Sequence, residues 1–178
     1  IILPMGISFY TFQATGYTID VYRNKIKPEK HFGIYALFVM FFPQLVAGPI
    51  ERSENLLPQF YKKHRFDFKR IISGIRIMFW GFFKKIVIAD RAAVAVNTIY
   101  NSASSYKGLY LFIATLLFTF QIYCDFSGYS DIAKGSARVL GFDLMDNFLN
   151  PYFSTSIKEF WRRWHISLST WFMDYVYI

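Results

Sequence analysis

Long uncharged stretches alternate with short charged ones along the chain. Residues 1–19, 33–50 and 108–124 contain no Asp, Glu, Lys or Arg, and each stretch is 17 to 19 residues long. This is close to the roughly 20 residues that cross a bilayer as a helix. A fourth stretch, 71–89, is mostly apolar but contains Arg76, Lys84 and Lys85, whose charges would reach an interface or face a polar interior. The pattern predicts three spanning candidates and a weaker fourth.

An unpaired peptide group in hydrocarbon costs several kcal/mol, so these stretches are predicted to be helices. No series of alternating, strand-length segments indicates a barrel. The predicted fold class is therefore all-α: a multi-pass transmembrane helical bundle with re-entrant and amphipathic helices. Residues 97–107 and 141–155 are rich in Asn, Ser and other turn-forming residues and are predicted to be connecting loops. No linker divides the chain, which is predicted to form a single membrane-embedded domain over 1–178.

The stretch 33–50 differs from a straight span. Pro43, Gly48 and Pro49 lie in its last third, where each proline removes a backbone donor. Both flanks are basic: residues 20–32 contain four Lys or Arg against two acids, and residues 51–70 contain six against three. Because basic flanks prefer the cytoplasm, the stretch is predicted to re-enter or break within the protein. An ordinary helix with a proline kink is the alternative.

An amphipathic helix is predicted over 158–177. Ser156 and, three residues later, Glu159 form a capping box that would begin it. On this helix Lys158, Arg162, His165 and Ser169 would cluster at the boundary between the apolar and polar faces. Such a helix suits a membrane interface or a polar cavity inside a bundle.

His165 is the candidate catalytic base of this cluster. A neutral imidazole can accept a proton from a hydroxyl that attacks an acyl carbonyl, and Arg162, Lys158 and Ser169 would bind an anionic donor or stabilise a developing oxyanion. The alternative is that His165 only hydrogen-bonds a neighbour or anchors the helix. The other histidines, His31 and His64, lie in lysine-rich segments that are typical of solvated loops.

A second polar concentration, 121–131, directly follows an apolar stretch. Acids at membrane depth usually line a cavity or pair with a base. Asp125 is therefore the second catalytic candidate, expected to orient His165 or to pair with Arg162 or Arg163. The alternative is that it marks the end of a helix at the interface.

Composition and charge agree with a membrane protein. Aromatic residues make up 21% of the chain and hydrophobic residues 54%, and the mean hydropathy is positive. The net charge of +8 comes from short clusters between apolar stretches instead of one continuous face, so no nucleic-acid partner is predicted. The single cysteine, Cys124, allows no internal disulfide. No G-x-S-x-G, Walker, H-E-x-x-H or C-x-x-C motif occurs, and no metal site is predicted.

Three segments in order carry a resemblance to a known family. FFPQLVAGPIERSENLLPQF (41–60), QIYCDFSGYSDIAKG (121–135) and NPYFSTSIKEFWRRWHISLSTWFMDYVYI (150–178) together resemble the membrane-bound O-acyltransferase family. More narrowly, they resemble its bacterial alginate and peptidoglycan O-acetylation proteins and D-alanyl transfer proteins. The histidine of the family's W-H block falls on His165, and the acid of its D-F-S-G-Y-S-D block falls on Asp125. Members have a further histidine downstream, and the chain is expected to be an internal piece of a longer protein, truncated at both ends.

The resemblance implies a multi-pass protein of the cell (cytoplasmic) membrane with a central tunnel. Its donor would be acetyl-CoA or another acyl thioester, with no bound cofactor. Its acceptor would be a cell-surface or exported polysaccharide, or a periplasmic or extracellular acyltransferase partner protein. The open alternatives are D-alanyl instead of acetyl transfer, a channel or transporter whose buried polar residues line a path, and a scaffold that recruits a soluble transferase.

Overall fold

The computed structural model describes residues 6–46 and 48–177, and the regular elements within those ranges are all helical. The helices in chain order are α1 (Ile7–Tyr22), α2 (Phe32–Val39), α3 (Ser53–Phe60), α4 (Phe68–Phe82), α5 (Asp90–Tyr100), α6 (Gly108–Leu140), α7 (Ile157–Arg163) and α8 (Ile166–Tyr175). The predicted all-α class is confirmed for this part of the chain.

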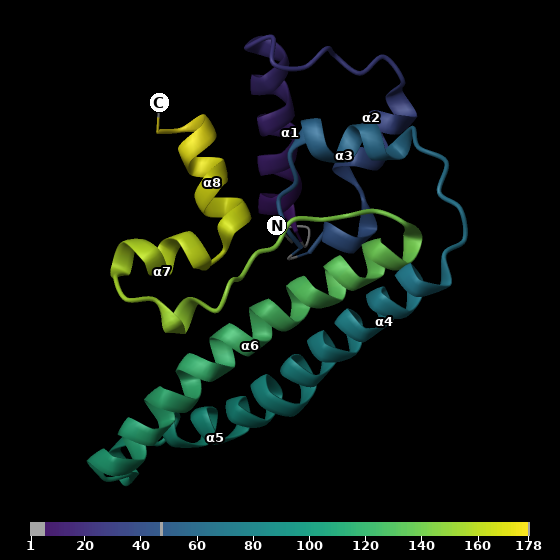
Figure 1. Ribbon diagram of the computed structural model, residues 1–178. Coiled ribbons are helices and arrows are strands. Elements are labelled where there is room, and N and C mark those ends of the chain that lie inside the picture. The colour runs from purple at the N-terminus through teal and green to yellow at the C-terminus, as the bar shows by residue number, and fades with distance from the viewer. Residues whose placement is uncertain (1–5, 47, 178) are drawn as a thin grey trace.

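The longest helix, α6, lies alongside α4 and α5 and runs opposite to them (Figure 1). Its 33 residues extend for about 50 Å at the helical rise of 1.5 Å per residue. Among the helices of the described ranges, α6 alone is long and apolar enough to cross a membrane. The predicted span 108–124 is thus helical, but the helix continues past Cys124 to Leu140 through the polar residues that follow.

Glycines allow α4 and α6 to approach until their backbones touch. A Cβ atom on Gly81 of α4 would lie 2.6 Å from the carbonyl oxygen of Gly128 on α6. One on Gly74 would lie 2.7 Å from the carbonyl oxygen of Gly135. Each helix repeats its glycine after seven residues, two turns along the same face. Close packing over small residues is typical of helices that associate within a membrane.

The segment between α4 and α5 is π-helical over Phe83–Ala89 and is called η2. Together, α4 and η2 contain the predicted span 71–89. The loop predicted to begin at residue 97 begins later, because α5 continues to Tyr100. The hydroxyl of Thr98 donates to the Val94 carbonyl at 2.7 Å, so this polar side chain is accommodated within the helix. The predicted connection 141–155 contains a single 3-10 turn, Pro151–Phe153.

The stretch 33–50 breaks as predicted. Helix α2 ends at Val39, and a separate 3-10 turn, Phe42–Gln44, contains Pro43. The two basic flanks lie together, since the Tyr61 hydroxyl donates to Glu29 Oε1 at 2.8 Å. Buried amides stabilise the break: Gln13 Nε2 donates to the Phe38 carbonyl at 2.7 Å, and Gln44 Nε2 donates to Gln13 Oε1 at 2.8 Å. Side chains thus replace the hydrogen bonds that a continuous helix would make.

Two apolar clusters hold the remaining helices together. The first lies between α2, α3 and the C-terminal end of α6 and is made of Phe38, Phe41, Leu56, Leu57, Ala137 and Leu144. In the second, Trp171 and Tyr175 of α8, together with Ile50, pack against α1 through Phe9, Phe12 and Ile19. Of the predicted span 1–19, residues 7–19 belong to α1, and residues 1–5 lie outside the described part of the chain.

Candidate functional site

The predicted helix 158–177 is not continuous. It begins as predicted, with Ser156 Oγ accepting from the Glu159 amide at 3.2 Å, but α7 ends at Arg163. His165 has a φ of 45°, in the left-handed region, and α8 begins at the next residue. The prediction of one amphipathic helix through His165 was therefore wrong, and His165 lies at a junction between two helices instead of on a helix face.

Pairing with a distant segment causes this break. The Leu149 amide donates to the Arg163 carbonyl and the Ile166 amide donates to the Asn147 carbonyl, both at 3.0 Å. These bonds flank an isolated β-bridge between Phe148 and Trp164. Backbone groups that a helix would use locally are bonded to the connection after α6, and nothing in the local sequence signals this partner.

Asn147 also caps α8. Its side chain is buried, with 2% of the residue exposed, and Oδ1 accepts from the Ser167 amide at 3.3 Å. A first-turn amide of a helix normally finds its acceptor in the residue that precedes the helix. Here the acceptor comes from 20 residues earlier in the chain. The orientation of His165 therefore depends on this asparagine, which the sequence analysis did not identify.

The imidazole of His165 lies among aromatic rings. The Phe126 ring packs against it edge to face with 4.6 Å between centroids, and the Phe9 ring lies at 6.4 Å. Its Nε2 is buried and has no hydrogen-bond partner within the described residues. Burial lowers the pKa of His165 from 6.5 to about 4, because removal from water disfavours the charged form. At neutral pH the ring is therefore neutral, and no group of the described residues occupies its Nε2.

The residues predicted to cluster with His165 are distributed over two helices. Lys158 and Arg162 are exposed on α7. Ser169 lies on α8, where its backbone amide donates to the His165 carbonyl at 3.0 Å and its hydroxyl donates to the Trp164 carbonyl at 3.3 Å. No side-chain hydrogen bond or ion pair joins the three to the imidazole in the described ranges. The predicted cluster depended on a continuous helix and does not form.

Asp125 does not pair with the groups expected from the sequence. Its carboxylate forms an ion pair with Lys85 at 2.6 Å, and Arg163 pairs with Glu159 at 2.6 Å. The reason is helical geometry: Phe126 faces His165, so the preceding residue points about 100° away, towards η2. The expectation that Asp125 orients His165 or pairs with Arg162 or Arg163 was therefore wrong.

The π-helical η2 brings a second lysine against α6. Lys84 is buried, with 8% of the residue exposed, and its Nζ lies 2.6 Å from Asp131 Oδ2 and donates to Ser127 Oγ at 3.0 Å. The sequence left open whether Lys84 reaches an interface or faces a polar interior. The structure shows that it faces polar groups of α6 inside the protein. π-helical turns are frequent at functional sites.

An apolar cavity of about 550 Å³ adjoins Lys84. Cys124, Tyr123 and Tyr152 form part of its wall. The Tyr123 ring also lies 6.2 Å from the ring of Trp164, the residue before His165. The Tyr123 ring thus lines the cavity and also packs near Trp164, and the cavity lining suits an apolar group.

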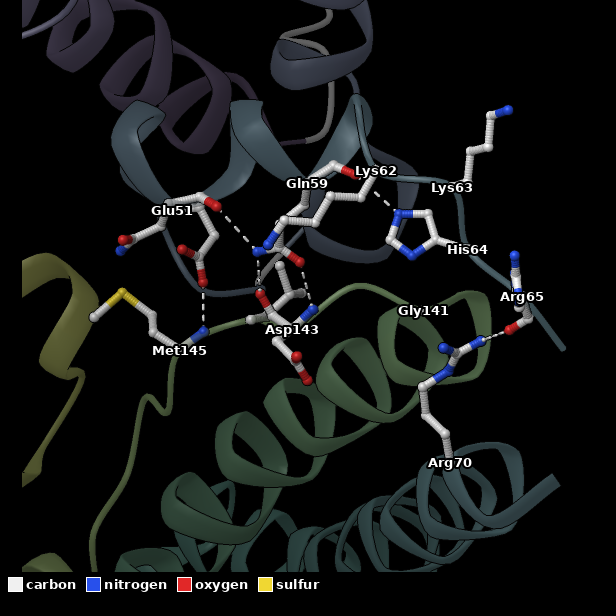
Figure 2. A pocket seen from close by; sticks show the side chains of 12 residues that line it. Glu51, Gln59, Lys62, Lys63, His64, Arg65, Arg70, Gly141, Asp143 and Met145 are labelled. Atoms are coloured by element: carbon white, nitrogen blue, oxygen red, sulfur yellow. Dashed lines mark hydrogen bonds between the residues drawn. The ribbon is translucent and has the colours of Figure 1, made fainter. Parts of the chain in front are cut away.

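A second, more polar pocket of about 580 Å³ lies at the C-terminal end of α6 (Figure 2). Gln59 forms part of its wall by donating to the Asp143 carbonyl at 3.0 Å and accepting from the Asp143 amide at 2.9 Å. Glu51 accepts from the Met145 amide. Burial raises the pKa of the Glu51 carboxyl from 4.5 to about 7.

A charged network fixes α8 to the start of α3. Arg52 donates to Asp174 Oδ2 from Nη2 at 2.8 Å and from Nε at 3.1 Å, and to the Thr170 hydroxyl at 3.1 Å. Nearby, the Tyr175 hydroxyl donates at 2.7 Å to Asp20, which is 4% exposed. Both of these Arg52 guanidinium nitrogens bond the same carboxylate oxygen, and with the bond to Thr170 they hold the helix that begins after His165. Within the described residues, no group of three or more His, Cys, Asp or Glu side chains is arranged to bind a metal ion.

Comparisons with known proteins agree with the sequence resemblance. The model of the MBOAT (membrane-bound O-acyltransferase) family matches residues 29–178. The chain is 45% identical over its whole length to the probable alginate O-acetylase AlgI of Pseudomonas aeruginosa and 38% identical to a peptidoglycan O-acetyltransferase of Helicobacter pylori. It is 30% identical over 98% of its length to a teichoic acid D-alanyltransferase of Bacillus subtilis. The chain spans 34%, 39% and 45% of the lengths of these relatives, respectively.

Proposed function

This chain belongs to the membrane-bound O-acyltransferase family, and on that premise we propose that the protein transfers an acyl group to a hydroxyl. The donor is a cytoplasmic thioester, acetyl-CoA in the simplest case, and it is a substrate instead of a bound cofactor. The acceptor is an exported or cell-surface polysaccharide, or a periplasmic or extracellular partner protein that relays the acyl group. The protein is a multi-pass component of the cytoplasmic membrane. The observation that carries this proposal is the similarity of the whole chain to alginate and peptidoglycan O-acetylating relatives.

Acetyl is favoured over D-alanyl as the transferred group. The relatives named for O-acetylation are 45% and 38% identical to the chain, whereas the D-alanyltransferase is 30% identical. Acyl groups can be released from the acceptor with base and identified by mass, which distinguishes acetyl from D-alanyl transfer.

His165 is the proposed general base. The acceptor oxygen attacks the thioester carbonyl while its proton passes to Nε2, and the imidazolium then returns the proton to the thiolate that leaves as the carbon–sulfur bond breaks. A neutral ring and an Nε2 without a hydrogen-bond partner in the described residues support this role. Lys158 and Arg162, exposed on α7, remain proposed contacts for an anionic part of the donor, and Ser169 helps to hold the junction.

The test replaces His165 in the complete protein. His165→Ala and His165→Gln are expected to lower the transfer rate at least about a hundredfold, because a general base contributes roughly 10²- to 10⁴-fold. Polysaccharide O-acetyl content is measured in cells expressing each variant, with membrane abundance determined in parallel.

The matched control is His31→Asn, since His31 caps α2 through Nδ1 and asparagine is also a good cap. This control is expected to retain parental acetylation. Parental acetylation in His165→Gln at normal abundance would exclude His165 from the mechanism.

A further inference from the structure

Four basic residues line the pocket at the C-terminal end of α6, and the Lys63 side chain extends away from the other three (Figure 2). Lys62, Lys63 and Arg65 come from the segment between α3 and α4, and Arg70 comes from the first turn of α4. We call this site the basic pocket. The residues 141–145 that follow α6 form its opposite wall.

The basic pocket has more positive than negative charge. Within the described residues, none of its four cations lies within ion-pair distance of a carboxylate, and the ion pairs that do form involve other lysines and arginines. The acids on its wall are Glu51 and Asp143. Burial favours the neutral form of Glu51, and its carboxylate faces the Met145 amide. Even with both acids ionised, four cations on the wall outnumber two carboxylates.

Local contacts hold the segment that carries these cations. Arg70 Nη2 donates to the Arg65 carbonyl at 2.9 Å, and a ring nitrogen of His64 lies 2.9 Å from the Gln59 carbonyl. The His64 ring also packs against Phe142, with 4.4 Å between centroids. Arg70 Nε is buried without a hydrogen-bond partner in the described part of the chain. The pocket is therefore a site whose walls are held in place by contacts within the chain.

The location of the pocket relates it to the membrane. It lies where α6 ends and α4 begins, at one end of the only helix in the described ranges that is long and apolar enough to span. Residues 61–70 at this end contain five Lys or Arg, whereas residues 97–107 at the other end contain only Lys107. An excess of Lys and Arg beside a span marks the cytoplasmic side.

We propose that the basic pocket binds a phosphate group at the cytoplasmic face of the membrane. Clustered lysines and arginines recognise phosphate through charge-assisted hydrogen bonds. Lys62, Lys63 and Arg65 are exposed and free to make them, and Arg70 adds a further positive charge. Two ligands supply this chemistry: the phosphates of a coenzyme A thioester, in which case the inference rests on the proposed function, and the headgroup of an anionic phospholipid.

The test measures binding to the full-length protein without turnover, so it remains informative if acyl transfer is not the activity. The protein is placed in nanodiscs of zwitterionic phosphatidylcholine, and the affinities of coenzyme A and of phosphate-free pantetheine are measured by calorimetry. In a second arm, phosphatidylglycerol retained by the protein is counted by native mass spectrometry. The pocket variant is Lys62→Gln/Arg70→Gln.

The matched control is Arg91→Gln/Lys107→Gln, which also removes one lysine and one arginine but from exposed positions outside the pocket. Lys62→Arg/Arg70→Lys keeps the charges and is expected to retain binding, which separates loss of charge from loss of folding.

The pocket variant is expected to bind coenzyme A about tenfold or more weakly, with pantetheine unaffected, if the donor supplies the phosphate. Loss of phosphatidylglycerol with unchanged coenzyme A affinity would instead identify the lipid headgroup, and it equally supports a phosphate site. Equal binding by the parent and the pocket variant in both arms, or equal losses in the pocket variant and the control, would overturn the proposal.

Discussion

Two titratable groups, the half-buried His165 and the buried Glu51, are both shifted towards their neutral forms. Burial lowers the pKa of His165 to about 4 and raises that of Glu51 to about 7. The cause is the same, since removal from water disfavours charge on an acid and on a base alike. A base with a lowered pKa accepts a proton less readily, but it stays unprotonated and available over a wider pH range.

The transfer rate should therefore show no inflection near pH 6.5, the ordinary pKa of histidine. We expect it to fall only as the pH approaches about 4, where the folded protein protonates His165. The stability of the fold should change with pH in the same direction. Between about pH 4 and pH 6.5 the unfolded chain binds more protons at His165 than the folded protein does, so the free energy of unfolding rises with pH over that window. The measurement is the pH profile of kcat/KM for the full-length protein. An inflection near 6.5 that disappears in His165→Gln would contradict it.

At the scale of elements, the pairing of α4 with α6 depends on the absence of side chains. Gly81 and Gly128 lie where the two helices touch, and any Cβ there would meet backbone atoms, which cannot move aside as a flexible side chain can. The same contact places η2 against α6, and with it the ion pair of Lys84 and Asp131. Packing at the glycines therefore positions the buried charges.

Gly81→Ala is expected to destabilise the protein by about 1–3 kcal/mol, because the new methyl group would lie 2.6 Å from the Gly128 carbonyl oxygen. Gly108→Ala is the matched control: a Cβ there meets nothing within 4 Å, and alanine is the better helix former. The unfolding midpoint in detergent is measured for both variants. Equal midpoints would mean that α4 and α6 are not in close contact.

At the scale of the whole molecule, large apolar side chains remain exposed along the α4–α6 pair, among them Phe79, Trp80, Phe112 and Leu116. A soluble protein seldom exposes such a surface, whereas lipid or neighbouring helices of a membrane protein would cover it. Basic residues are concentrated in 61–70, near the C-terminal ends of α3 and α6. Few lie in the turn between α5 and α6, at the other end of α6. The α4–α6 pair therefore has one strongly basic end.

Cysteine labelling tests this arrangement in a Cys124→Ala background of the full-length protein. Lys25→Cys and Lys62→Cys are expected to react from the cytoplasmic side, because the two basic flanks of 33–50 lie together. Ser104→Cys, in the exposed α5–α6 turn, is expected to react from the opposite side. Labelling of positions 25 and 62 from opposite faces would refute the re-entrant path.

The sequence alone determined the features that local physics controls. Apolar stretches must be helical where water is absent, prolines end a helix near residue 43, and a serine with a glutamate three residues later begins one at 156. Each of these follows from the residues' own backbone chemistry. The family resemblance likewise required only the order of residues along the chain.

Only the tertiary structure decided which groups meet. The break at His165 arises because residues 147–149 take the backbone hydrogen bonds of 163–166, and Asp125 pairs with Lys85 because the neighbouring Phe126 occupies the face towards His165. The basic pocket joins two segments more than 70 residues apart, Lys62–Arg70 and 141–145. Helical periodicity describes one isolated element, whereas each of these contacts is set by a partner that lies far away in the sequence.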